Sequence, residues 1–153
     1  MSRSFHIRVP CTSANIGPGF DVVGLSLSLY LFLDVTIEAD APHKDPVLTY
    51  SGQGAADAPL NPYQNLITRV ALYVMRVNDI KSFPRGVRIH VRNDIPFGRG
   101  LGSSGAAVIA GLLLGNELGQ LHIDRDRLLD YALMIERHPC LLYTSDAADD
   151  MQC

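Results

Sequence analysis

The segment at residues 96–107 constrains the fold of this 153-residue chain more than any other part of it. Its sequence places Gly98, Gly100 and Gly102 between a strand-like run and a long apolar run. Because glycine adopts positive φ and lets the backbone approach a ligand closely, successive N–H groups here can converge on phosphate oxygens. A helix that begins near Ser103 would add the positive end of its dipole. The order of strand, glycine loop and helix therefore predicts a cradle for an anion.

Other interpretations of this loop have to be compared with the cradle. A tight strand-to-helix turn with a serine N-cap explains the same residues equally well. A Walker-type loop does not fit, because it requires Gly-Lys-Ser or Gly-Lys-Thr and this chain has Gly-Ser-Ser-Gly. A dinucleotide fingerprint requires an acidic residue about twenty positions further on, after a second strand. Glu117 and Asp124 fall inside or just after the predicted helix, which fits that pattern poorly.

Strands are expected in three regions of the chain. Apolar and polar residues alternate at 5–10 and at 86–91, which predicts two strands with one buried face each. The Leu- and Val-rich run at 22–37 predicts strand pairs in a sheet. The pattern breaks at 40–46, and the Gly- and Pro-rich stretch at 51–62 predicts a surface loop.

Helical spacing of apolar residues predicts three helices. The first covers 65–77, the second covers 104–118 and is apolar on nearly all sides, and the third begins at Asp124, whose side chain can cap it. The residues expected to face the core are Leu66, Val70, Val74 and Val77 in the first helix, and Leu128, Leu129, Ala132 and Ile135 in the third. Strands and helices without a regular βαβ alternation predict an α+β fold.

The composition indicates one domain that acts on small molecules. A 153-residue chain with 47% hydrophobic residues can bury one sizeable core. The net charge of −3 and the absence of a basic stripe argue against nucleic acid as a partner. The longest apolar run, at 106–114, is shorter than the roughly 20 residues of a membrane helix, and no secretory signal is visible. Cys11 is the only cysteine before residue 140, so we expect no disulfide framework and a cytoplasmic location.

Three segments, in this order along the chain, resemble one family. The glycine loop, Pro-x-Gly-x-Gly-Leu-Gly-Ser-Ser-x-Ala, is similar to the phosphate-binding loop of the GHMP kinases. The run at 9–21, which ends in Ser-Ala-Asn-Ile-Gly-Pro-Gly-Phe-Asp, resembles the opening of the homoserine kinases within that superfamily. The run Ile-Glu-Arg-His-Pro at 135–139 resembles the start of their third motif. The form Gly-Ser-Ser-Gly-Ala-Ala of the glycine loop, together with residues 134–139, looks closest to the homoserine kinases of fungi. The resemblance implies an N-terminal domain like ribosomal protein S5 domain 2, with a mixed or antiparallel sheet packed by helices.

The resemblance covers residues 5–139 and then stops. The family would continue with Asp-Asn, whereas residues 140–153 resemble a translated sequencing adapter, with a natural polar tail as the alternative. We therefore expect residues 1–139 to form the ATP-binding domain and exclude 140–153 from the fold. The C-terminal domain of the family is expected to lie outside this chain.

The resemblance implies a site for ATP and Mg²⁺. Asn65 would lie near the adenine, although helix N-capping explains Asn65 equally well. The hydroxyl of Ser104 and the carboxylate of Glu136 are hard oxygen ligands of the kind that Mg²⁺ prefers, although Glu136 also suits a solvated helix end. The implied ATP-binding residues are Pro96, Gly98, Arg99, Gly100, Leu101, Gly102, Ser103, Ser104, Gly105 and Ala106, together with Asn65.

The resemblance also implies a substrate site formed by Asn15, Asp21 and His138. An amide and a carboxylate suit a substrate that carries an ammonium group and a hydroxyl. Without the resemblance, Asn15 and Asp21 would be interpreted as turn formers. No catalytic residue is assigned, because the asparagine that should follow Pro139 is absent. We therefore expect this chain alone to be inactive or nearly so.

The implied function is ATP-dependent phosphorylation of the side-chain hydroxyl of L-homoserine, a step in threonine biosynthesis. The resemblance also allows a homodimer of the full-length protein, with no nucleic acid or membrane as partner. Two alternatives stay open. One is another small-molecule kinase of the superfamily, such as a mevalonate-pathway enzyme. The other is a non-catalytic protein, either a nucleotide-binding fragment or a module of the translation machinery that shares the S5-like fold.

Overall fold

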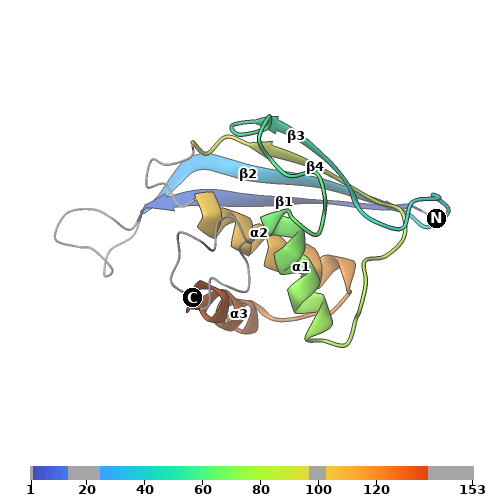
Figure 1. Ribbon diagram of the computed structural model, residues 1–153. Helices are drawn as coiled ribbons and strands as arrows, with labels where there is room; N and C mark the ends of the chain where they lie inside the picture. The colour runs from blue at the N-terminus through green and yellow to red at the C-terminus, as the bar shows by residue number, and fades with distance from the viewer. Residues whose placement is uncertain (1, 14–24, 97–102, 138–153) are drawn as a thin grey trace.

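A mixed β-sheet forms the base of the molecule. The computed structural model describes residues 2–13, 25–96 and 103–137. Within these residues the sheet has four strands, in the order β1-β2-β4-β3 (Figure 1). Its strands are β1 (Ser2–Ser13), β2 (Leu25–Glu38), β3 (Val47–Gly52) and β4 (Val87–Asn93). β2 runs antiparallel to both β1 and β4, whereas β3 runs parallel to β4.

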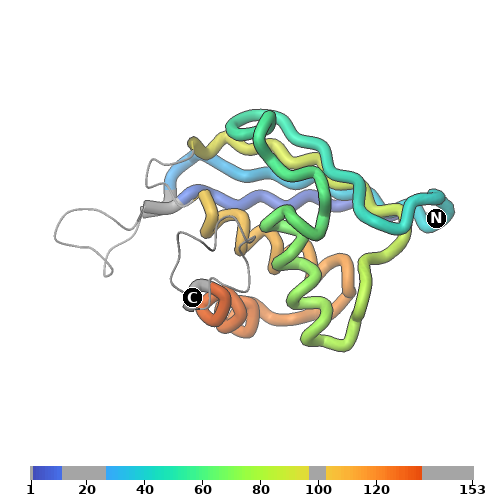
Figure 2. The backbone as a smooth tube through the Cα atoms, viewed as in Figure 1, coloured from blue at the N-terminus to red at the C-terminus, as the bar shows by residue number. Residues whose placement is uncertain are grey.

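Helices cover one face of this sheet, as Figures 1 and 2 show. They are α1 (Leu66–Arg76), α2 (Ser103–Leu118) and α3 (Arg125–Arg137). α2 lies against β1 and β2, and both α1 and α3 pack on α2. This arrangement confirms the predicted α+β class, with a mixed sheet packed by helices.

Alternation along the strands decides which side chains enter the core. In β4 every second residue is buried, and Val87, Ile89 and Val91 are at most 1% exposed. Leu33 and Val35 of β2 are equally buried, whereas Arg88, His90 and Arg92 occupy the exposed positions of β4. The sheet therefore has one apolar face under the helices and one face open to solvent. Cys11 is fully buried, which agrees with a packed residue.

Two glycines allow α1 and α2 to approach each other closely. A Cβ atom on Gly111 would lie 2.5 Å from the carbonyl oxygen of Ile67, and one on Gly115 would lie 2.3 Å from Val74 Cγ1. The contacts advance along both helices in the same direction, so α1 and α2 run parallel. The N-terminal ends of both helices consequently lie at the same end of the pair.

Several predicted elements are confirmed, but their details differ. Of the region at 22–37, the described residues 25–37 all belong to one long strand, β2, in place of strand pairs. Val77 follows α1 as its C-cap and is 48% exposed, so its predicted place in the core is wrong. Leu129 is 55% exposed and is also wrong as a core residue. The face of α3 that packs carries Leu128, Ala132 and Ile135. Leu129 follows Leu128 by one residue, and because each residue turns a helix by about 100°, Leu129 projects away from this face.

None of the helices in the described part of the chain has the length and apolar character needed to cross a membrane.

Candidate functional site

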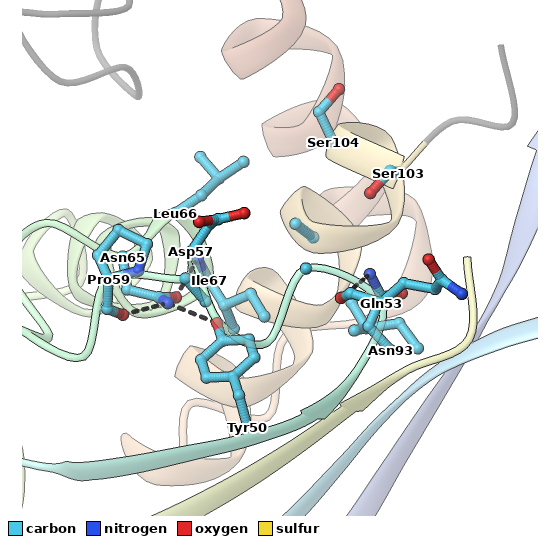
Figure 3. A pocket seen from close by; sticks show the side chains of 14 residues that line it. Tyr50, Gln53, Asp57, Pro59, Asn65, Leu66, Ile67, Asn93, Ser103 and Ser104 are labelled. Carbon is cyan, nitrogen blue, oxygen red and sulfur yellow. Dashed lines mark hydrogen bonds between the residues drawn. The ribbon is translucent and has the colours of Figure 1, made fainter. Parts of the chain in front are cut away.

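A cleft of about 430 Å³ lies where the N-terminal ends of α1 and α2 meet the ends of β3 and β4. Figure 3 shows its lining, which comes from segments far apart in the sequence. The lining includes Tyr50 of β3, Gln53, Asp57 and Pro59 of the following loop, Asn65, Leu66 and Ile67 at the start of α1, Asn93 of β4, and Ser103, Ser104 and Ala107 of α2.

The N-terminus of α2 gives the cleft a positive end. Ser103 is partly buried, Ser104 is exposed, and both line the cleft in the first turn of a 16-residue helix. The first N–H groups of a helix have no partner within it, and the helix dipole adds to their positive charge. No acidic residue lies in this first turn to offset that charge. This end of the cleft is therefore suited to an anion.

Asn65 caps α1 and connects it to the wall of the cleft. The side chain is 3% exposed, and its Oδ1 accepts a hydrogen bond of 3.0 Å from the backbone N–H of Ile67. Its Nδ2 donates to the Tyr50 hydroxyl at 2.5 Å and to the Pro59 carbonyl oxygen at 2.9 Å. The capping interpretation of Asn65 is thus confirmed, and Asn65 also lies at the cleft.

Asn93 joins the two chain segments that flank the cleft. It is 5% exposed, and its Oδ1 accepts a bond of 3.0 Å from the N–H of Ile95. Its Nδ2 donates to the carbonyl oxygens of Gln53 and Ile95, both at 3.2 Å. Gly52 at φ +87° makes this approach feasible, since a Cβ atom there would lie 2.3 Å from the carbonyl oxygen of Asn93.

The Tyr50 hydroxyl is a neutral donor at physiological pH. Burial raises its pKa above the ordinary value of 10.0, and the hydrogen bond from Asn65 opposes this shift in part. A phenol with a raised pKa keeps its proton, so Tyr50 brings no charge to the cleft.

The structure brings together three of the residues expected at the nucleotide site, Asn65, Ser103 and Ser104. Gly105 and Ala106 lie in the first turns of α2, and Ala106 is 5% exposed within the core. Pro96 ends the described segment that leads into the loop. Five of the expected residues lie outside the described part of the chain, namely Gly98, Arg99, Gly100, Leu101 and Gly102.

The expected metal and substrate residues are placed less completely. Asn15, Asp21 and His138 lie outside the described residues. The backbone of Glu136 belongs to the last turn of α3, which runs back along α2 toward the end where Ser104 lies (Figure 1). Over the ranges 2–13, 25–96 and 103–137, no three His, Cys, Asp or Glu side chains cluster as a metal site would require.

Sequence reasoning missed Tyr50, Gln53, Asp57 and Asn93. Asn93 carried a readable signal, because an amide occupies the core-facing position that follows Val87, Ile89 and Val91. Tyr50, Gln53 and Asp57 carried no such signal, because β3 is a short strand and the sequence of the following loop is typical of a surface turn.

Comparisons with known proteins give the family of this fold and cleft. A family model described as the N-terminal domain of GHMP kinases matches residues 65–151. Homoserine kinase of Saccharomyces cerevisiae is 56% identical over 91% of this chain, and that of Candida albicans is 58% identical over 89%. The chain spans only 41% and 39% of the length of these two relatives.

Solved structures agree with this family. Homoserine kinase from Cytophaga hutchinsonii superposes with a TM-score of 0.65 at 26% identity, over 90% of this chain and 42% of that one. Mevalonate kinase from Methanococcus jannaschii reaches a TM-score of 0.66 at 15% identity, over 88% of this chain and 46% of that one, which is a likeness of fold alone. Because the family match covers more than half of the chain, the chain belongs to the GHMP kinases.

Proposed function

We propose that this chain is the nucleotide-binding part of a homoserine kinase. Such an enzyme transfers the γ-phosphoryl group of ATP to the side-chain hydroxyl of L-homoserine and releases O-phospho-L-homoserine, for threonine biosynthesis, and ADP. Sequence similarity supports this proposal, since two yeast proteins named homoserine kinase are 56% and 58% identical to this chain. The observation that carries the proposal is the cleft at the shared N-terminal end of α1 and α2.

The two ends of this cleft suit the two ends of a nucleotide. Phosphate oxygens would accept hydrogen bonds from the first N–H groups of α2 and from the hydroxyl of Ser103. Away from these serines the wall is mainly apolar and includes Pro59, Leu66 and Ile67, which suits the faces of a base. A nucleotide bound in this direction would direct its terminal phosphate toward the glycine loop.

Residues from the start of α2 and the end of α3 are proposed to hold Mg²⁺. The hydroxyl of Ser104 is exposed at the cleft, and Glu136 would supply a carboxylate from the end of α3. These are hard oxygen donors, and Mg²⁺ needs few of them because phosphates and water complete its coordination. When bound, Mg²⁺ spreads the negative charge that develops on the transferred phosphoryl group.

The acceptor alcohol is proposed to lie beside the phosphates, against Asn15, Asp21 and His138. Asp21 would pair with the ammonium group of homoserine, and Asn15 would direct its hydroxyl toward the phosphoryl group. Alignment and charge stabilisation would then supply most of the rate increase, since no general base is assigned. A cytoplasmic location and a homodimer of the full-length protein stay predictions.

A chimera tests the proposed function. Residues 1–139 would replace the matching part of the S. cerevisiae relative, and ATP-dependent phosphorylation of homoserine and mevalonate would be measured side by side. We expect phosphorylation of homoserine and none of mevalonate. The opposite preference, or a folded chimera that consumes no ATP with either alcohol, would contradict the proposal.

A pair of serine variants tests the role of the α2 N-terminus in the same chimera. Ser104→Ala should lower the apparent affinity for Mg²⁺ at least about tenfold, as the loss of a group that serves a metal site does. Ser82→Ala is the matched control, because Ser82 is exposed and lies outside the cleft lining. If both substitutions change the apparent affinity for Mg²⁺ equally, Ser104 is not a ligand of the metal.

A further inference from the structure

The amide of Asn65 has no donor left for a ligand. Its two N–H bonds already point to the Tyr50 hydroxyl and the Pro59 carbonyl oxygen. The backbone N–H of Ile67 fixes the orientation of the amide, because that donor requires the Oδ1 side. Asn65 therefore lies at the cleft as a support for other groups.

Tyr50 presents the donor that Asn65 lacks. Its hydroxyl accepts the hydrogen bond from Asn65, and among the described residues no acceptor receives its own proton. The side chain lines the cleft, and burial keeps the phenol protonated by raising its pKa. A donor in this position requires an acceptor, which water supplies in the free protein and a ligand can supply in the complex.

The position of Tyr50 in the cleft limits what that acceptor can be. Figure 3 shows Tyr50, Asn65 and Pro59 on one side of the cleft, away from Ser103 and Ser104 of α2. If the phosphates lie at α2, as proposed above, the base of the nucleotide lies on the side of Tyr50. The acceptors that a purine ring offers there are its ring nitrogens.

We propose that Tyr50 determines affinity for the purine base, by donating a hydrogen bond from its hydroxyl to a ring nitrogen of ATP. Asn65 is the positioning residue of this pair, because its hydrogen bond holds the Tyr50 oxygen while leaving the Tyr50 proton free for the base. This inference rests on the proposed function, since it takes the cleft to be the ATP site.

Calorimetric titration of the 153-residue chain tests the proposal with two ligands, MgATP and magnesium tripolyphosphate. Tyr50→Phe should weaken MgATP binding about 5- to 20-fold, the effect of one hydrogen bond to a buried group, and should change tripolyphosphate binding less than twofold. Tyr63→Phe is the matched control. It also removes one tyrosine hydroxyl, but that hydroxyl donates to Asp45 and lies outside the cleft lining.

Deaza analogues identify the acceptor atom and separate contact from folding. The chain should bind one of 1-deaza-, 3-deaza- and 7-deaza-ATP more weakly than ATP, and Tyr50→Phe should bind that analogue and ATP equally. Three results would overturn the assignment of Tyr50. The first is an unchanged MgATP affinity in Tyr50→Phe, and the second is an equal loss of affinity for ATP and tripolyphosphate in that variant. The third is that no analogue binds as tightly as ATP to Tyr50→Phe after binding more weakly than ATP to the unsubstituted chain. Absence of binding of either ligand to the unsubstituted chain would instead overturn the proposed function and this inference with it.

Discussion

At the scale of single residues, two buried asparagines hold the backbone around the cleft. Asn65 and Asn93 each accept one backbone N–H two residues further along the chain and donate both amide hydrogens to other groups. A buried amide with every donor in use is stabilising, whereas its removal leaves its partners unpaired. The wall of the cleft thus depends on side chains that are not expected to touch a ligand themselves.

Substitution of Asn93 should reveal this dependence. Asn93→Ala leaves the N–H of Ile95 and the carbonyl oxygen of Gln53 without their partner, so we expect the free energy of unfolding to fall by about 2–3 kcal/mol. Asn61→Ala is the control, because Asn61 is exposed and its side chain accepts a single N–H, from Tyr63. Urea denaturation measures the free energy of unfolding of both variants. A similar decrease in both would show that the Asn93 hydrogen bonds contribute little to stability.

The raised pKa of Tyr50 predicts a pH dependence of stability. Below pH 10 the phenol is protonated in the folded and the unfolded chain, so its contribution is constant. Above pH 10 the unfolded chain releases this proton first, and stability falls as the pH rises toward the folded pKa. Urea midpoints between pH 8 and 11 should therefore fall more steeply for the unsubstituted chain than for Tyr50→Phe. If the midpoints of both proteins fall in parallel with pH, folding does not shift the pKa of Tyr50.

At the scale of elements, the parallel packing of α1 on α2 creates the cleft. The contacts of Gly111 with Ile67 and Val70, and of Gly115 with Val74, bring the two helices closer than larger side chains would permit. Since the helices run in the same direction, their N-terminal ends lie together beside the ends of β3 and β4. An apolar wall and a positively polarised helix end consequently face the same space.

Gly115→Ala tests this close approach. Alanine favours a helix over glycine by about 1 kcal/mol, so an exposed position would gain stability from the change. Here the new Cβ would lie 2.3 Å from Val74 Cγ1, and we expect a net loss of about 1–3 kcal/mol from overpacking. Ile109→Ala on the exposed side of α2 should cost much less. Thermal unfolding compares the stability of the two variants. If Gly115→Ala is more stable than the unsubstituted chain, α1 and α2 do not approach as closely at Gly115 as the structure shows.

At the scale of the whole molecule, segments that span residues 31–107 form the cleft proposed to bind the nucleotide. The helices cover one face of the sheet, and the strand ends and helix ends meet at the cleft (Figure 1). The relatives are more than twice as long as this chain, so most of their residues have no counterpart in it. Binding of nucleotide and completion of the reaction can therefore be separated by experiment.

We expect the 153-residue chain to bind MgATP without phosphorylating homoserine. Described residues line the proposed nucleotide cleft, whereas the third-motif asparagine expected after Pro139 is absent from the sequence. Calorimetry with ATP and a coupled assay for ADP release measure the two properties, with an RNA oligonucleotide as a second ligand. Turnover at the rate of the full-length S. cerevisiae relative would contradict this prediction, and binding of RNA in place of ATP would favour a non-catalytic module.

Local sequence patterns were enough to predict the α+β class, the family and the start of a helix at Ser103. These features are local, because periodicity and turn residues report the conformation of one segment. Only long-range packing brings Tyr50 and Asn93 to the same cleft as Asn65, and only long-range packing leaves Val77 and Leu129 exposed. The physical reason is that side-chain partners and the covered face of a helix depend on which distant segment packs against it. A pattern within one segment carries no record of that neighbour.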